Sequence, residues 1–429
     1  FRIKSHYCPE YFYLLYYKVS VYLGCIKCYL YLDLILYPIR TMYSRTHFSE
    51  LLSLIPRYKF NQFVLKYSAD KHNKGFNSWT HLVTMVFSQL SKANSLREIE
   101  TSFNSVVNAH FHMGARSIKR STLSEANQKR DFRVFADLAN ELMKNFRPSK
   151  QKELKEFLFL LDSSPIILQG RHFDWTNKTR NYNNGLKLHM LYDTHTTTPT
   201  YIDITASNIN DINIGRELPI QPNATYVFDK GYTDYNWWFS IHKKQSFFVT
   251  RFKKNAATHI IEELPINKSD TQLVLADQKV IFKNKTPRGG KINQYTVPLR
   301  KITIRRDNKN TPLVIATNDF NKSAGEIASL YKKRWDIELF FKWIKQNLKI
   351  KRFIGTSLNA VKTQIYTAII TYLLSLKLQK LKENTLPFYL FLEKLSALLF
   401  VPVTLIKNDG HSQKKKDQLL IKQQLNFSW

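Results

Sequence analysis

Cysteine is nearly absent from this chain. Only three of the 429 residues are cysteines, and Cys8, Cys25 and Cys28 all lie near the start. A disulfide framework and a thiolate metal site are therefore excluded for the rest of the chain. Cys25 and Cys28 have the spacing of half a zinc site, but no second pair completes it. This cysteine usage indicates a reducing compartment, and we expect a cytoplasmic protein.

Acidic side chains are also few. The chain has 33 Asp and Glu residues against 65 Lys and Arg residues, which gives a formal net charge of +32. An excess of this size indicates an anionic partner, either nucleic acid or an anionic membrane surface. A basic surface that only keeps the protein soluble is the alternative, and the size of the excess favours nucleic acid.

Long apolar runs are missing as well. Residues 1–41 are rich in Tyr and Leu, but Lys18, Lys27 and Asp33 interrupt them, so no uncharged run reaches the ~18 residues that a membrane span needs. These residues hold nine tyrosines, and they have no signal-peptide cleavage site. We interpret residues 1–41 as upstream read-through before a true start at Met42, or as a disordered segment. A membrane anchor is the alternative, and we expect no membrane partner.

Glycine is sparse, with 12 residues in the whole chain. The sequence contains neither a glycine-rich loop that would cradle phosphates nor the strained turn that presents a nucleophilic serine. Nucleotide-binding loops and serine-hydrolase chemistry are therefore not expected.

The N-terminal part of the chain has the pattern of helices. Residues 42–150 carry apolar side chains at spacings of three and four residues. Residues 120–135 predict a turn into a basic helix that Ser121 or Ser124 caps. We predict an all-helical N-terminal domain that binds DNA. A helical bundle that only positions a neighbouring domain is the alternative.

The sequence period changes after residue 154. Short apolar or alternating runs predict three strands, a helix and a fourth strand; the strands are at 157–162, 186–193, 200–206 and 224–229. This order, followed by a further helix, is that of a ribonuclease H-like core. We therefore predict an α/β fold with a ribonuclease H-like catalytic domain over residues 151–385.

A mostly β insertion is predicted to interrupt this core. Strand-like runs fill residues from about 246 to 317. Long helices are predicted after it, at about 323–348 and 358–381. Residues 386–429 predict a basic C-terminal tail.

Two aspartates end predicted strands of the core. Asp162 ends the first strand and Asp229 ends the fourth. In a core of this order these two strands are neighbours, so both carboxylates meet at one edge of the sheet. Two anions held close together need a cation, and oxygen ligands favour Mg²⁺ or Mn²⁺. A turn residue or a helix cap is the alternative interpretation of each aspartate alone.

A third acid lies on a helix with a polar stripe. Tyr331, Arg334, Glu338 and Lys345 fall within about 60° of one another at ~100° per residue. Glu338 in this stripe can complete a metal site, while its phenol and cationic neighbours can bind phosphates. The alternative is a solvated charged face in which Arg334 and Glu338 form an ordinary ion pair.

These motifs resemble the DDE transposases of bacterial insertion sequences, in particular the group named for insertion sequence four. The signature of that group is Tyr, two residues, Arg, three residues, Glu, six residues and Lys, and the helix stripe fits it without a gap. The stretches FLLDSSPI and FDKGYTDY resemble the family's sequences around its first and second Asp. GLKLHMLYD, ITASNINDI and the helical N-terminal region are also similar to this family. The resemblance covers roughly residues 46–380.

The resemblance implies a transposase that cuts DNA at transposon inverted-repeat ends and joins the 3′-hydroxyl to target DNA. Asp162, Asp229 and Glu338 would be the catalytic residues and would bind two Mg²⁺ or Mn²⁺ ions, ~3.5–4 Å apart. The group also implies a homodimer that bridges two DNA ends, and a bacterial protein that is nucleoid-associated when it is bound to DNA.

Six residues are candidates for DNA contact. The resemblance implies that the other members of the signature, Tyr331, Arg334 and Lys345, hold terminal phosphates. Basic residues near the second acid are further candidates for phosphate contacts, with a solvated turn as the alternative: Lys230, Arg251 and Lys253. His189, in the second strand, is interpreted as a packed histidine rather than a base.

One departure concerns hairpin formation. Relatives that form DNA hairpins stack a flipped base on a Trp of the insertion, whereas no Trp lies within residues 246–317 here. Four aromatic residues are the candidates to replace it: Phe247, Phe248, Phe252 and Tyr295. The alternative is that these side chains are core residues of the insertion, which is the more common role of such aromatics. In that case hairpins do not form.

Two other functions fit the sequence. The first is a nuclease with the same core but without specificity for transposon ends. The second is a non-catalytic DNA-binding relic of a transposase, against which the intact acids and the cationic stripe argue. Inverted repeats in the DNA that flanks the gene would favour the transposase.

Overall fold

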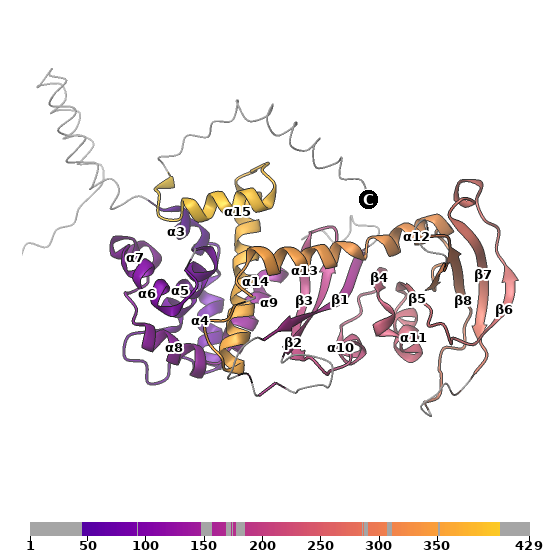
Figure 1. Ribbon diagram of the computed structural model, residues 1–429, viewed down its shortest axis with the longest axis horizontal. Coiled ribbons are helices and arrows are strands. Elements are labelled where there is room, and N and C mark those ends of the chain that lie inside the picture. Colours follow the sequence, from indigo (N-terminus) through magenta and orange to yellow (C-terminus); the bar gives the residue numbers. More distant parts are fainter. Residues whose placement is uncertain are drawn as a thin grey trace, which may run out of the picture.

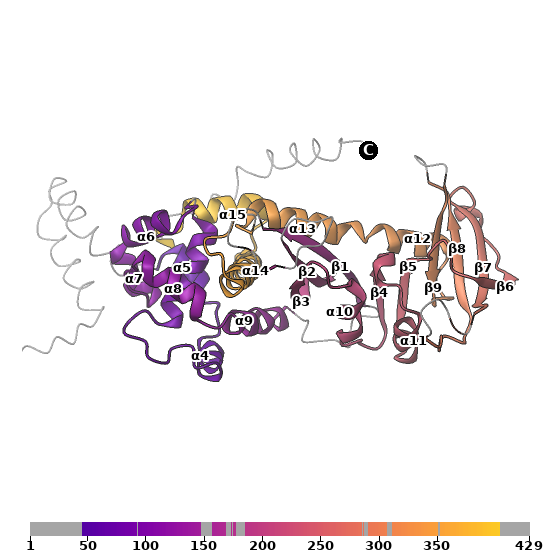
Figure 2. The ribbon, with the colours of Figure 1, turned by 60° about the horizontal axis from the view of Figure 1, so that its bottom comes forward.

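The computed structural model describes residues 45–91, 93–146, 157–168, 173, 175–176, 185–284, 286, 291–306, 311–350 and 352–403. Residues 1–41, the cysteines and most of the expected basic tail lie outside these residues, so the interpretations made of them stay predictions. In Figures 1 and 2 a helical body occupies one end of the molecule, and a long sheet extends from it to the other end.

Residues 45–146 are all-helical where they are described, as predicted. The helices are α3 (His47–Leu52), α4 (Arg57–Lys66), α5 (Ser78–Leu90), α6 (Leu96–Asn104), α7 (Val107–Met113), α8 (Arg120–Lys129) and α9 (Arg133–Lys144). The basic helix α8 is present but begins at Arg120, earlier than predicted, so Ser121 and Ser124 lie inside it and neither caps it. Its N-cap is Lys119, which makes no side-chain capping hydrogen bond.

Two later helices complete the helical body. α14 (Leu358–Leu381) packs against α5, α8 and α9, and α15 (Phe388–Ala397) packs against α14 and α5. Beyond α15 the main chain returns to the start of the domain, where Phe48 N donates to Leu399 O at 2.8 Å. Residues 358–381 were predicted as a helix within residues 151–385, and residues 386–429 were predicted as a basic tail. The start of this tail is instead the packed helix α15, because its apolar side chains Phe391, Leu392 and Leu395 are buried.

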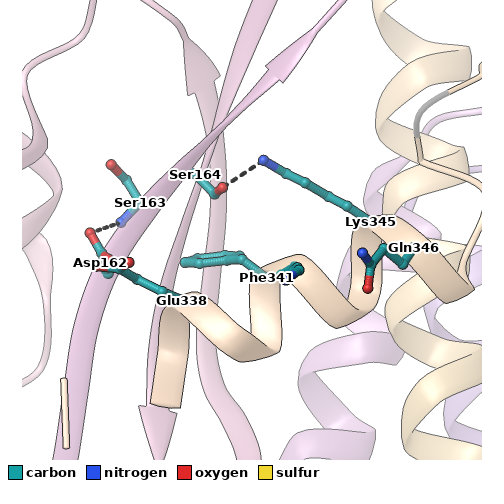
Figure 3. A pocket seen from close by; sticks show the side chains of 8 residues that line it. Asp162, Ser163, Ser164, Glu338, Phe341, Lys345 and Gln346 are labelled. Atoms are coloured by element: carbon teal, nitrogen blue, oxygen red, sulfur yellow. Dashed lines mark hydrogen bonds between the residues drawn. The ribbon is translucent and has the colours of Figure 1, made fainter. Parts of the chain in front are cut away.

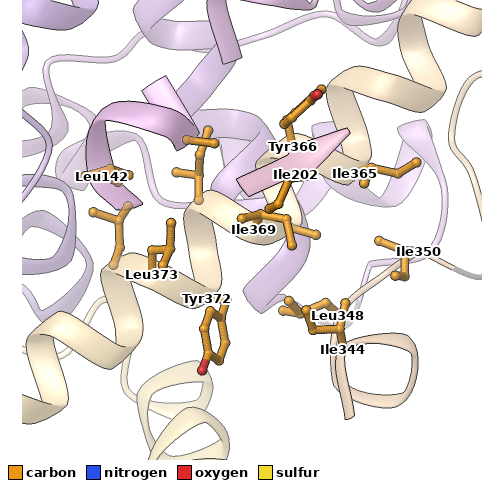
Figure 4. Close-up of a cluster of buried hydrophobic side chains, with 14 of the residues drawn as sticks. Leu142, Ile202, Ile344, Leu348, Ile350, Ile365, Tyr366, Ile369, Tyr372 and Leu373 are labelled. Carbon is orange, nitrogen blue, oxygen red and sulfur yellow. The ribbon is translucent and has the colours of Figure 1, made fainter. Parts of the chain in front are cut away.

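The helical body and the sheet meet at a continuous apolar core. Figure 4 shows Ile365 and Ile369 of α14 beside Leu142 of α9, Ile202 of β3 and Ile344 of α13, and all five side chains are buried. The two parts are therefore joined by packed side chains as well as by the chain itself.

One nine-stranded sheet runs through the second part, in the order β3-β2-β1-β4-β5-β9-β8-β7-β6. The strands of the predicted core are β1 (Phe157–Ile167), β2 (Gly185–Asp193), β3 (Thr198–Ala206) and β4 (Ala224–Phe228). β1 pairs with β2 antiparallel and with β4 parallel, so the predicted adjacency of the first and fourth strands is confirmed. Strand β1 is longer than predicted and continues five residues beyond Asp162, because β2 pairs with it as far as Ile167.

The fifth strand belongs to the core and not to the insertion. β5 (Phe247–Arg251) pairs parallel with β4. The prediction that the insertion begins at about 246 is therefore wrong, because the insertion begins after β5. The insertion itself is β-rich, as predicted, with β6 (Thr258–Glu263), β7 (Val274–Phe282), β8 (Leu299–Ile304) and β9 (Leu313–Thr317). Its strands extend the core sheet through the antiparallel pairing of β9 with β5.

Helices cover both faces of the sheet. In Figures 1 and 2, α10 (Asp211–Glu217) and α11 (Tyr235–Lys243) lie on one side, and α12 (Ala324–Lys332) and α13 (Trp335–Asn347) lie on the other. A single helix was predicted at 323–348. It divides at Lys333 and Arg334, where Arg334 N donates to Tyr331 O in a tightened turn. None of the described helices has the length and apolar character needed to cross a membrane.

Candidate active site

Strand alternation places two carboxylates on the face of the sheet that α12 and α13 cover. Leu160 of β1 and Val227 of β4 belong to the apolar core that these helices share. Because successive side chains point to opposite faces, Asp162 and Asp229, each two residues further along, share this face. By the same alternation, Arg251 at the end of β5 also lies on this face. The parallel register also puts the two acids at neighbouring positions, since the residues before them, 161 and 228, are partners.

The third acid reaches this place from α13. Figure 3 shows Glu338 pointing from the helix toward Asp162 on β1. The guanidinium of Arg334 lies between these two side chains: its Nη1 is 2.5 Å from Glu338 Oε1 and 3.5 Å from Asp162 Oδ2. The charge of Arg334 also lowers the pKa of Asp229. The structure therefore brings Asp162 and Glu338 together at Arg334, with Asp229 close enough for the charge of Arg334 to lower its pKa.

A second cation holds Asp229. Arg251 Nη2 donates to Asp229 Oδ1 at 2.6 Å. Burial raises the pKa of Asp229, but the Arg251 contact and a backbone hydrogen bond from Lys230 outweigh burial and lower the pKa. Tyr331, which is 9% exposed, is faced by Arg251, Arg334 and Asp229, and burial raises the pKa of its hydroxyl.

Asp162 carries the strongest perturbation among the three acids. The pKa of Asp162 is raised to about 6, chiefly by burial and more weakly by the neighbouring carboxylates Glu338 and Asp229. The Ser163 backbone N–H and Arg334 act in the opposite direction but do not compensate. A carboxyl group whose pKa is raised by burial and by neighbouring anions is typical of functional sites.

A cavity of about 460 Å³ opens beside Asp162 and Glu338. Its other lining residues include Lys342 and Lys345 of α13, so anionic and cationic groups line one cavity (Figure 3). Lys345 Nζ donates to Ser164 Oγ and to the carbonyl oxygen of residue 165, both at 2.7 Å. These contacts hold Lys345 against β1, two residues beyond the first acid.

Two further predicted DNA contacts do not line this cavity. Lys230 is exposed and follows Asp229 directly. Lys253 lines a different cavity, of about 650 Å³, together with Tyr235 and Lys291. His189 is fully buried, contacts Thr205 Oγ1 at 2.8 Å and has its pKa lowered to about 4 by burial, as expected of a packed histidine.

The aromatic candidates for base stacking belong largely to the core. Phe248 and Tyr295 are 0% and 2% exposed, so neither can stack on a base without unpacking. Phe247 and Phe252 are half-buried, and Phe252 packs against Trp238 and Phe282. The interpretation of these residues as core is therefore favoured by their burial.

Comparison with known proteins identifies the family. A profile described as "Transposase DDE domain" matches residues 154–374, and a second, "Domain of unknown function (DUF4372)", matches residues 44–116. The chain belongs to the DDE transposase family. This transposase is 37% identical over 280 residues to the "Putative transposase y4zB" of Sinorhizobium fredii (strain NBRC 101917 / NGR234), an alignment that covers 65% of this chain and 76% of that protein.

Two further relatives are named for insertion sequences. The "Putative transposase for insertion sequence element IS4SA" of Synechocystis sp. (strain ATCC 27184 / PCC 6803 / Kazusa) is 30% identical over 293 residues, 65% of this chain and 77% of that protein. The "Probable transposase for insertion sequence element IS5377" of Geobacillus stearothermophilus is 28% identical over 217 residues, 51% and 55% of the two chains. The resemblance to the insertion-sequence-four group is thereby confirmed.

Among solved structures, a piggyBac transposase synaptic complex with hairpin DNA, determined by cryo-EM, is similar at 13% identity with a TM-score of 0.43. That similarity covers 90% of this chain and 84% of the other. The family match and the observed sheet together establish the predicted α/β, ribonuclease H-like class.

The donor set of this transposase suits a divalent metal ion, although the side chains do not form a finished metal site. Among the described residues, no group of three or more Asp, Glu, His or Cys side chains is arranged to hold a metal ion. Arg334 lies between two of the three acids instead. The donors themselves are all carboxylate oxygens, the ligands that Mg²⁺ and Mn²⁺ prefer. The residues present therefore fit such an ion once Arg334 moves aside.

One charged residue near the site was missed at the sequence level. Asp211, the first residue of α10, accepts a hydrogen bond from Ser163 Oγ at 2.8 Å and lies 3.0 Å from Lys187 Nζ. It lies within ITASNINDI, which the sequence analysis noted only as similar to the family. The available signal was a lone Asp at a helix start, which most often is a cap.

Proposed function

We propose that this transposase cuts DNA at the inverted-repeat ends of its element and joins the freed 3′-hydroxyl to target DNA, in cut-and-paste transposition with two divalent metal ions. The proposal rests on one observation: Asp162, Asp229 and Glu338 gather around Arg334 beside a cavity that Lys342 and Lys345 also line. Carboxylates for metal ions and cations for phosphates are the two components that phosphoryl transfer requires.

The three carboxylates would hold Mg²⁺ or Mn²⁺. When bound, these ions supply the charge that activates the attacking oxygen and stabilises the leaving oxygen. The chain itself contributes the placement: β1 and β4 fix the two aspartates on one face of the sheet, and α13 brings Glu338 over them. Because Asp162 is held with its pKa near 6, a cation at this place would favour the ionised form.

The cations around the acids would bind the DNA backbone. Lys345 lies on the cavity wall, and Arg334 and Tyr331 lie at the acids. A phosphate can exchange for a carboxylate as the partner of a guanidinium, because both anions accept paired hydrogen bonds from it. Arg251 is paired with Asp229 and would make the same exchange.

Lys230 and Lys253 would bind DNA outside the cavity beside Asp162 and Glu338. Lys230 is exposed beside Asp229, and Lys253 lines the second cavity. We also propose that the helical N-terminal domain binds DNA, in agreement with the net charge of +32, and that two copies act on two DNA ends.

The test is strand cleavage by the purified full chain. Duplexes that carry the terminal inverted repeats, labelled on each strand, are incubated with Mg²⁺, and specific nicking at the 3′ end of the transposon strand is expected. Glu338→Gln should reduce this cleavage by about three orders of magnitude or more, because it removes one carboxylate charge, while DNA binding stays within about twofold. Asp336→Asn, a change in the same turn of α13 but outside the lining of the cavity, is the matched control.

The outcomes separate the candidate functions. Cleavage without preference for the repeats would support the nuclease, and binding without cleavage would support the non-catalytic relic. Unchanged cleavage by Glu338→Gln would show that this acid does not take part.

A further inference from the structure

We infer that Asp211 is a positioning residue of the catalytic site, which fixes the chain segments carrying Asp162 and Asp229 from the opposite face of the sheet. This inference rests on the proposed function, since it concerns the same carboxylates. It starts from the strand alternation: Ser163 points away from the face on which Asp162 lies. On that opposite face Ser163 meets Asp211 of α10.

The first segment is held by hydrogen bonds. Ser163 Oγ donates to Asp211 Oδ1 at 2.8 Å, while the backbone N–H of Ser163 donates to Asp162 Oδ1 at 2.8 Å. One residue therefore connects the two carboxylates through its side chain and its main chain. A change in the position of Ser163 alters the orientation of Asp162.

The neighbouring strand contributes to the same contact. Lys187 and His189 of β2 lie opposite Pro165 and Ser163 in the antiparallel register. Lys187 Nζ is 3.0 Å from Asp211 Oδ1, and His189 Nδ1 is 3.7 Å from it. The Lys187 side chain is 19% exposed and that of His189 is fully buried, so the charge of Asp211 meets its cation largely away from water.

The second segment is held by close packing. Gly231 lies two residues after Asp229, and a Cβ added there would be 3.2 Å from Asp211 Oδ2. Gly215 of α10 has a similarly close neighbour in Tyr232, whose Cδ1 would lie 3.2 Å from an added Cβ. The turn after Asp229 therefore lies directly on α10. Asp211 therefore adjoins both acid-bearing segments: its Oδ1 accepts from Ser163, and its Oδ2 lies where a side chain on Gly231 would be.

The test compares Asp211→Asn with Glu217→Gln in the full chain. Glu217 is exposed at the other end of α10, so its substitution makes the same carboxylate-to-amide change without these contacts. Two quantities are measured: Mn²⁺ binding to the DNA-free protein by electron paramagnetic resonance, and single-turnover cleavage of pre-bound repeat ends at increasing Mg²⁺. Removing a partner that orients metal ligands costs about 10–100-fold in affinity or rate.

We expect Asp211→Asn to lower the Mn²⁺ affinity and the cleavage rate by at least tenfold, with unchanged DNA binding and with the protein still folded at the assay temperature. Glu217→Gln should match the wild type. Ser163→Ala, which keeps the Asp211–Lys187 pair, should reproduce part of the loss, and Ser163→Thr should restore it. If Asp211→Asn unfolds the protein, the two Ser163 variants decide the question.

The inference is overturned if Asp211→Asn folds and behaves as Glu217→Gln does. If Asp211→Asn does not fold, the inference is overturned when both Ser163 variants behave as Glu217→Gln does. Its failure is distinguishable from failure of the proposed function. If the wild type does not cleave the repeats, the proposed function fails, and the Mn²⁺ affinities still test the positioning role.

Discussion

At the scale of single residues, the site is defined by cations that lie where its carboxylates need neutralisation. Arg334 contacts Glu338 and Asp162, and Arg251 contacts Asp229. Each guanidinium reduces the repulsion between neighbouring anions, which burial would otherwise make severe. The same side chains are the proposed phosphate ligands, so binding of the DNA backbone would draw them from the acids.

Arg334→Ala should therefore have two opposite effects. Binding of repeat-end DNA should weaken by about three- to tenfold, because a charge-assisted phosphate contact is lost. Mn²⁺ binding to the DNA-free protein should strengthen, because the cation that competes for Asp162 and Glu338 is removed. Gel shift and electron paramagnetic resonance measure the two effects. A variant that binds Mn²⁺ less tightly than the wild type would contradict this role of Arg334.

Asp162 provides a prediction of pH dependence, measured in EDTA. Its folded pKa, about 6, lies above the ordinary value of 3.8, so the folded protein holds this proton more tightly than the unfolded chain. The resulting contribution to stability is present below about pH 4 and is lost as the pH rises through 6. Asp162→Asn lacks this loss, so its stability relative to the wild type should increase by about 2–3 kcal/mol from pH 4 to pH 7.

The measurement is the thermal midpoint of both proteins across this pH range. Glu217→Gln, the same kind of charge removal at an exposed position of α10, serves as the control and should show a nearly constant difference from the wild type. A constant difference for Asp162→Asn as well would mean that its carboxyl group is not perturbed.

The sequence identified the three acids but not their immediate partners. Asp162 and Asp229 were predictable as neighbours because strand order and alternation depend on short-range patterns. The Arg334–Glu338 ion pair was weighed as an alternative and is present. The contacts of Arg334 with Asp162 and of Arg251 with Asp229 were not predictable, since they depend on side-chain conformations and on the pairing of β5. Asp211 was missed because its partners, Ser163 and Gly231, are distant in sequence and have ordinary identities in such positions.

At the scale of elements, the insertion stabilises the helix that leads to the third acid. Asp270, in the segment between β6 and β7, accepts a hydrogen bond from Gly325 N at 2.9 Å, at the start of α12. Ser323 and Glu326 form a capping box at the same helix end. The β-rich insertion thus holds α12 where the helix leaves β9. Contacts made by the insertion can in this way act on α12 and α13.

This contact predicts that the effect of Gly325→Ala on stability changes sign when Asp270 is removed. A Cβ at position 325 would lie 2.6 Å from Asp270 Cγ, so Gly325→Ala should destabilise the wild type by displacing the Asp270 side chain. In the Asp270→Ala background the obstacle is gone, and Gly325→Ala should stabilise the protein by up to about 1 kcal/mol through helix propensity. Thermal midpoints of the four proteins measure the cycle. Equal effects in both backgrounds would rule out the contact.

Element types were predicted better than element partners. The β runs at 247–251 and 313–317 look alike in sequence, yet one lies parallel to β4 and the other antiparallel to β5. Nothing local to a short apolar run specifies its neighbour. The division between α12 and α13 was likewise unpredictable, because no Pro or Gly marks it and both residues at the break keep right-handed helical dihedral angles.

At the scale of the whole molecule, the helical body is assembled from both ends of the described chain. α14 is buried on nearly all sides, as expected of a helix that is apolar around its circumference. Its neighbours α5, α8 and α9 precede the catalytic domain, and α14 itself follows it. Sequence position alone suggested a boundary near residue 150, because periodicity identifies a buried helix without showing which domain buries it.

An isolated fragment of residues 45–146 should therefore fail to fold cooperatively. Without α14, the core side chains of α5 and α9 would lie in solvent, and each large apolar group exposed costs about 1.5–3 kcal/mol. Joining residues 352–403 through a flexible linker of about 20 residues should restore a sharp thermal transition and dispersed amide resonances. The same joined protein with Leu373→Asp, a charge at a fully buried position of α14, is the matched control and should remain unfolded. A fragment of residues 45–146 that unfolds cooperatively by itself would show that the N-terminal helices form an independent domain and that α14 only docks on it.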